Sequence, residues 1–129
     1  MKSRPYPQGV QGIKVGRKCA RFHFLHATTW SVNDGVVVGT YVVHYADDTS
    51  QSLKIVYGKD LRDWWVGTDN AVELKSAQVA WQGQTSNGDA VRIYSRTWEN
   101  PLPDREVDTI DFISTMTQCA PFLLALTVE

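Results

Sequence analysis

Apolar and polar residues alternate with a period of two through most of this 129-residue chain, and helical periodicity is scarce. Neighbouring side chains of a strand point to opposite faces, so such segments form strands with one face toward a core. The alternation predicts strands over residues 20–28, 39–46, 51–57, 74–82, 90–98, 105–114 and 121–128. We expect one domain, residues 1–129, in which residues 1–12 form an irregular lead or an edge segment.

The same alternation predicts which apolar side chains share a face. The expected groups are Phe22, Phe24 and His26; Tyr41, Val43 and Tyr45; Leu53, Ile55 and Tyr57; and Phe122, Leu124, Leu126 and Val128. The last group suits a central strand that borders the core.

Turn residues separate the predicted strands. The triplet Asp47-Asp48-Thr49 links two of them as a hairpin, and Asn87-Gly88 is a strong hairpin signal between two others. Seven or eight short strands at regular spacing indicate an all-β fold, an antiparallel β-sandwich of jelly-roll type.

The net charge of the chain does not favour binding to nucleic acid. The formal net charge is −1, and no recognition helix or basic and aromatic interleaving is present, so we expect no nucleic-acid binding. Residues 1–33 nevertheless hold six basic residues and no acidic one. That segment is either a solvated basic edge or a segment that docks on an acidic surface.

The cysteine and hydropathy patterns limit the cellular compartments in which we expect this protein. Cys19 and Cys119 are free thiols or form one disulfide, and no Cys/His cluster indicates zinc, so we expect no metal and no cofactor. No apolar run is long enough to span a bilayer, so we expect no membrane insertion. The start lacks a signal-peptide core. We expect a cytoplasmic protein, or a piece of an exported one.

Five phrases together resemble the galactose-binding-domain-like β-sandwich module of environmental bacteria. They are residues 23–28 (HFLHAT), 42–47 (VVHYAD), 55–65 (IVYGKDLRDWW), 98–101 (WENP) and 120–129 (APFLLALTVE). The resemblance covers residues 13–129 and implies a binding module of the kind appended to larger envelope, regulatory or carbohydrate-active proteins. Two features depart from the pattern: Asp47-Asp48 stands where glycine is usual, and a usual further strand ahead of residues 9–15 is missing. The lead therefore supplies a shorter edge, or a partner chain covers an exposed edge.

The strand over residues 90–98 carries the best ligand candidates. Its even positions are Arg92, Tyr94, Arg96 and Trp98, and its odd positions include Val91 and Ile93. If the odd face enters the core, the even face presents cations and aromatic rings to a saccharide or a small anion. The neighbouring loop adds Arg62, Asp63, Trp64 and Trp65, with one tryptophan of the pair buried and one at the surface. Two alternatives remain open for the even face: intramolecular packing and a subunit interface.

The motifs of catalysis are missing from the sequence. Neither a nucleophile elbow, a phosphate-binding loop nor a zinc-protease motif occurs, so we do not expect an enzyme. His23, His26 and His44 lie on predicted strands and are expected to be hydrogen-bonded structural residues. We expect a non-catalytic binding module, with carbohydrate as the ligand. The alternative is a module that self-associates as a homo-oligomer or assembles with a partner, and has no small-molecule ligand.

Overall fold

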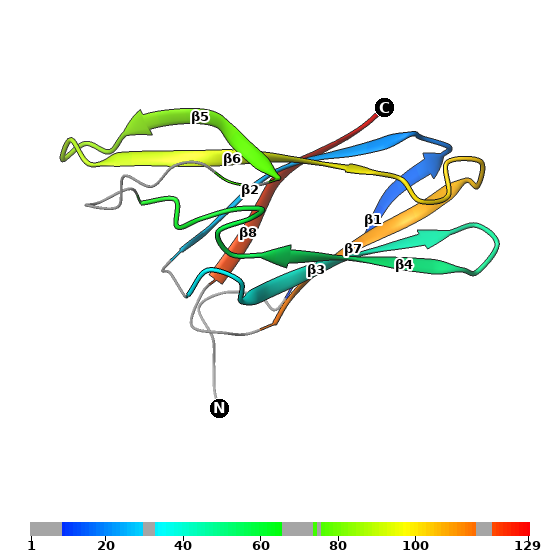
Figure 1. The fold of residues 1–129 in the computed structure, drawn as a ribbon. Coiled ribbons are helices and arrows are strands. Elements are labelled where there is room, and N and C mark those ends of the chain that lie inside the picture. The colour runs from blue at the N-terminus through cyan, green and yellow to red at the C-terminus, as the bar shows by residue number, and fades with distance from the viewer. Residues whose placement is uncertain (1–8, 30–32, 66–73, 75, 116–119) are drawn as a thin grey trace.

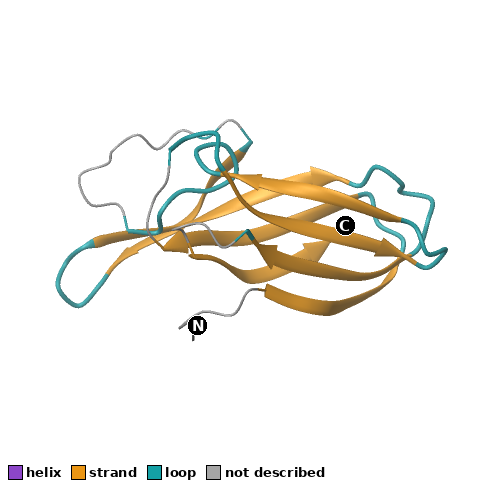
Figure 2. Ribbon diagram, turned by 90° about the horizontal axis from the view of Figure 1, so that it is seen from below, coloured by secondary structure: helices purple, strands orange, loops and turns teal. Residues whose placement is uncertain are grey.

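The computed structural model describes residues 9–29, 33–65, 74, 76–115 and 120–129. Eight strands lie in this part of the chain: β1 (Gly9–Arg17), β2 (Arg21–Thr29), β3 (Val37–Tyr45), β4 (Ser50–Val56), β5 (Ala77–Gln84), β6 (Ala90–Glu99), β7 (Val107–Ser114) and β8 (Ala120–Val128). The described residues are strands and loops (Figure 2). None of them belongs to a helix that could cross a membrane.

The strands form two antiparallel sheets that pack face to face (Figure 1). Sheet A has the order β1-β7-β3-β4, and sheet B has the order β5-β6-β2-β8. The antiparallel β-sandwich that the alternation predicts is thereby confirmed. β1 begins at Gly9 and lies at the edge of sheet A, so residues 9–12 of the expected lead belong to an edge strand that is paired with β7.

Three of the four predicted faces meet between the sheets. Phe22 and Phe24 of β2, Tyr41 and Val43 of β3, and Ile55 of β4 have no exposed surface. The rings of Phe24 and Tyr41 stack across the interface, with 3.8 Å between their centroids. Burying each such side chain stabilises the fold by about 1.5–3 kcal/mol, so this layer accounts for much of the hydrophobic stabilisation.

The prediction for the last strand is wrong in two respects. β8 is an edge strand of sheet B and not a central one. Its pairing with β2 shifts by one residue between Leu25 and His26, so the alternation changes face near Leu124. Leu126 pairs with Phe24 at the core, whereas Leu124 is 59% exposed.

Both predicted hairpins form. Asp48 takes a positive φ of 70° in the β3–β4 turn, which explains how an acidic residue replaces the usual glycine there. Gly88 has a φ of 85° in the β5–β6 turn after Asn87. Cys119 lies outside the described residues, and Cys19 is a buried free thiol.

The loop after β6 is tied to the core by a buried amide. Asn100 is 5% exposed, and its Oδ1 accepts hydrogen bonds from the Tyr45 hydroxyl at 2.6 Å and the Leu102 amide at 2.9 Å. Its Nδ2 donates to the Cys19 carbonyl at 2.7 Å. One side chain therefore joins three segments that are far apart in the sequence, and burial raises the pKa of Tyr45 in this contact.

Candidate functional site

The even face of β6 points into the sandwich rather than to solvent. Tyr94, Arg96 and Trp98 pair with His26, Phe24 and Phe22, whose side chains form the core. Residues directly opposite each other in an antiparallel pair share a face. The surface-ligand interpretation of this face is therefore corrected to intramolecular packing, one of the two alternatives.

An ion pair explains how a cation is accommodated on this inner face. Nε of Arg96 donates to Oδ1 of Asp60 at 2.7 Å, and the side chain of Asp60 is 1% exposed. The guanidinium lies over the ring of Trp98, 3.9 Å from its centroid, and also donates to the Thr97 carbonyl. The second oxygen of Asp60 accepts from the Val56 amide at 2.8 Å. The carboxylate, the ring and the backbone carbonyl together hold the guanidinium of Arg96 on the inner face.

His26 belongs to the same buried network. Its Nε2 lies 2.9 Å from the Asp60 carbonyl, and its Nδ1 lies 2.6 Å from the Tyr41 hydroxyl. A carbonyl only accepts, so Nε2 carries the proton and Nδ1 accepts from Tyr41. Burial lowers the pKa of His26 to about 4 and raises the pKa of Tyr41. Both groups are thus neutral structural residues, as expected for this histidine.

The loop that carries the other four candidates fills a split in sheet B. β2 and β6 pair as far as His26 and Tyr94. Beyond that point, the Trp64 amide donates to the Thr28 carbonyl at 2.8 Å, and the Arg92 amide donates to the Trp64 carbonyl at 2.7 Å. The backbone of Trp64 therefore lies between β2 and β6, and the Trp64 side chain lies on sheet B.

The four loop candidates separate into different environments. Arg62 pairs with Asp34 at 3.1 Å, and burial raises the pKa of Asp63, whose Oδ1 accepts from the Trp65 amide. Trp64 is half-buried with its ring edge-on to Phe122, while Trp65 is 42% exposed. As expected, Trp64 is the more buried residue of the pair and Trp65 the more exposed one, although Trp64 is only half-buried. Arg92 donates to Gln82 Oε1 at 3.3 Å and does not join the loop.

Trp64 opens onto an apolar groove on the outer face of sheet B. The groove has a volume of about 630 Å³, and its lining residues are Leu25, Thr29, Trp64, Trp81, Ile93, Phe122 and Leu124. Three aromatic rings come from the β2–β6 split, from β5 and from β8. An exposed apolar surface of this kind is typical of a ligand or protein contact.

Trp81 is the most exposed of the groove's aromatic residues that sequence reasoning missed. The pairing of β5 with β6 shifts between Val79 and Trp81, which turns Trp81 outward beside Ile93. It is 54% exposed, and the edge of its ring lies over Gly83, where an added Cβ would be 2.6 Å from the ring. A glycine inside a predicted strand often marks a bulge or a close approach, so Gly83 was the available signal.

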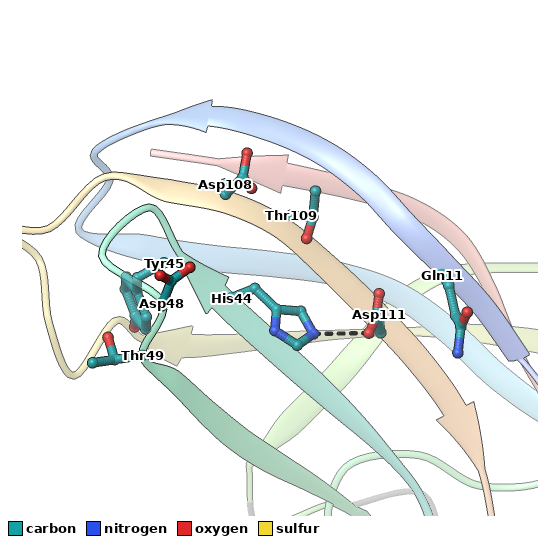
Figure 3. A pocket seen from close by; sticks show the side chains of 8 residues that line it. All are labelled: Gln11, His44, Tyr45, Asp48, Thr49, Asp108, Thr109 and Asp111. Carbon is teal, nitrogen blue, oxygen red and sulfur yellow. Dashed lines mark hydrogen bonds and ion pairs between the residues drawn. The ribbon is translucent and has the colours of Figure 1, made fainter.

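A polar hollow lies on the opposite side of the molecule, on the outer face of sheet A (Figure 3). Its volume is about 410 Å³, and its lining residues are Gln11, His44, Tyr45, Asp48, Thr49, Asp108, Thr109 and Asp111. Nε2 of His44 lies 2.8 Å from Asp111 Oδ2, while Asp111 Oδ1 accepts from the Gly12 amide at 2.8 Å. Burial favours a higher pKa for Asp111, but these two hydrogen bonds outweigh it and hold the pKa below its ordinary value.

The hydrogen bonds in the hollow connect strands β1, β3 and β7. Among the residues that the structure describes, no group of three His, Cys, Asp or Glu side chains is arranged to hold a metal ion. The His44–Asp111 bond instead connects β3 with β7, and Gly12 connects β7 with β1. We therefore assign these contacts to the cohesion of sheet A.

No protein-family model, curated protein or solved structure matches this chain. The resemblance to galactose-binding-domain-like modules is therefore an expectation from the sequence.

Proposed function

We propose that this chain is a non-catalytic binding module that takes a saccharide on the outer face of sheet B. The observation that carries the proposal is the convergence of Trp64, Trp81 and Phe122 on one apolar groove. Aromatic planes suit the C–H faces of sugar rings, and ligand sites are mostly apolar with few polar groups. The resemblance to modules of carbohydrate-active proteins is a second reason to test saccharides first.

The test is a thermal-shift screen against mono- and oligosaccharides, followed by calorimetric titration of any sugar that stabilises the protein. A ligand that prefers the folded state raises its stability, so saturable stabilisation is expected. Trp81→Ala should abolish it, because the variant removes the groove's most exposed aromatic ring, which is 54% exposed. Trp65→Ala is the matched control, since Trp65 is exposed outside the groove. Equal affinities of Trp81→Ala and wild type would place the ligand elsewhere.

Small anions have less support as ligands. The two arginines that would bind them from the inner face and the loop, Arg96 and Arg62, already pair with Asp60 and Asp34. The anions belong in the same screen, where their failure to stabilise the protein is the expected result.

A second candidate function is assembly with another protein surface or with a second copy. The observation that favours it is Leu124, which is 59% exposed beside the groove. Light scattering at a protein concentration of about 50 μM tests self-association, because an oligomer with a micromolar Kd would be populated at that concentration. A monomeric mass at that concentration would argue against self-association, and Leu124→Lys should disperse any oligomer that uses this face.

A further inference from the structure

The outer face of sheet B changes from apolar to polar along its strands. Three rows of cross-strand neighbours run from the edge of the groove: Leu25 with Ser95 and Ala125, His23 with Thr97 and Thr127, and Arg21 with Glu99 and Glu129. Same-face residues of a strand lie about 7 Å apart, so the face from Ile93 to Glu99 measures about 20 Å. We call this surface, from the groove to the row of Arg21, the strip. It is longer than one sugar ring needs.

The middle row holds hydrogen-bonding groups in fixed positions. Nδ1 of His23 lies 2.8 Å from Thr97 Oγ1, and Nε2 lies 2.8 Å from Glu129 Oε1. With the carboxylate accepting from Nε2, Nδ1 accepts from Thr97, whose oxygen keeps lone pairs for a ligand hydroxyl. These bonds hold the row before any ligand arrives, which reduces the entropy lost on binding.

The last row is charged: one cation, Arg21, lies between two carboxylates, Glu99 and Glu129, which gives the row a formal charge of −1. Nε of Arg21 lies 2.9 Å from Glu99 Oε2, and NH1 lies 3.6 Å from Glu129 Oε2. The hydrogen bond from His23 and the charge of Arg21 lower the pKa of Glu129, so it is a carboxylate acceptor. A neutral, hydroxyl-rich ligand therefore suits this row better than an anionic one.

The position of the strip on a sheet face also selects the ligand. An extended peptide that binds a sheet usually pairs with the backbone of an edge strand, whereas a face offers only side chains. Here the side chains offer aromatic planes at one end and hydroxyl, imidazole and carboxylate groups at the other. Rings with C–H faces and hydroxyl edges match both parts of the strip.

We propose that the strip binds a neutral oligosaccharide chain lengthwise, with one ring in the aromatic groove and the following units over the rows of Thr97 and Arg21. This inference rests on the proposed saccharide function and adds the length and direction of the ligand. It predicts that affinity increases with chain length, because added units reach new hydrogen-bonding rows.

The experiment is a calorimetric titration of the whole chain with glucose and with β-1,4-linked glucose di-, tetra- and hexasaccharides, repeated with the corresponding N-acetylglucosamine series. The hexasaccharide of the recognised series should bind at least about tenfold more tightly than its disaccharide. The double variant Thr97→Val, Thr127→Val should lower hexasaccharide affinity to that of the disaccharide and leave disaccharide affinity unchanged. Thr109→Val, on the outer face of sheet A, is the matched control and should bind like wild type.

The outcomes separate the two proposals. Equal affinity for di- and hexasaccharide, or a double variant that binds like wild type, overturns the lengthwise strip and leaves the groove intact. Failure of every saccharide of both series to bind overturns the strip, and the broader panel then decides the saccharide function itself. Near-ultraviolet circular dichroism of each variant checks that its aromatic packing is native.

Discussion

Oδ1 of Asp60 and Nε of Arg96 lie 2.7 Å apart inside the sandwich, although 36 positions separate them in the sequence. The pair accommodates the guanidinium of Arg96 on the inner face of β6, between the rings of Tyr94 and Trp98. A buried charge is tolerated only when it is paired and hydrogen-bonded, and here the Trp98 ring and the Val56 amide complete the arrangement.

Asp60→Ala should destabilise the fold by about 3–5 kcal/mol, because it leaves the Arg96 charge uncompensated in the interior. Urea denaturation of the variant and of wild type measures the difference. Asp34→Ala, which breaks the more exposed pair with Arg62, is the control and should cost no more than about 1 kcal/mol. Equal losses in the two variants would contradict a special role for the buried pair.

Stability should fall as the pH decreases from about 6.5 to about 4, with His26 as a main cause. Burial lowers its pKa in the folded chain to about 4 from 6.5, so the unfolded chain binds more protons in this window. The free energy of unfolding should decrease by up to about 3 kcal/mol from this group. Urea denaturation across the window measures the slope.

His26→Gln tests the assignment of that pH dependence. Glutamine can accept from the Tyr41 hydroxyl and donate to the Asp60 carbonyl, but it does not titrate. The variant should lose most of the slope between pH 6.5 and 4. An unchanged slope would assign the proton uptake to other groups.

Gly83→Ala should weaken saccharide binding without unfolding the protein. The added methyl would lie 2.6 Å from the Trp81 ring, which must move from its position over the strand. Since the far end of a side chain can shift, we expect little change in Tm and about a tenfold loss of affinity, or about 1.4 kcal/mol. Gln82→Ala, on the opposite face, is the control, and a Gly83→Ala variant with full affinity would show that the ring position is unimportant.

Asn100→Ala should destabilise the fold by about 2–3 kcal/mol. It removes the partner of the buried Tyr45 hydroxyl, the Leu102 amide and the Cys19 carbonyl together. Thermal unfolding followed by circular dichroism reports the loss. Asn87→Ala in the exposed β5–β6 turn is the comparison and should change the free energy of unfolding by less than about 1 kcal/mol. A small effect at Asn100 would mean that water replaces its contacts.

The candidate site could be predicted only in part. Trp64 was identified from its loop, but its groove partners Trp81 and Phe122 were not, because both follow register shifts that leave little trace in the sequence. The even face of β6 was recognised as chemically unusual, but the sequence left open whether it faces a ligand, the core or another subunit. Its partner Asp60 lies in a different segment, and no local pattern connects the two.

The sequence by itself determined strands β2 to β8, the two hairpins and the buried faces of β2, β3 and β4, because alternation and turn chemistry act between near neighbours, whereas β1 was not predicted as a strand. The tertiary structure alone decided which face of β6 is buried and where β5 and β8 change face. A period of two offers two equivalent faces, and a one-residue bulge exchanges them. Only the pairing of distant strands, and the ion pair that it buries, selects between those faces.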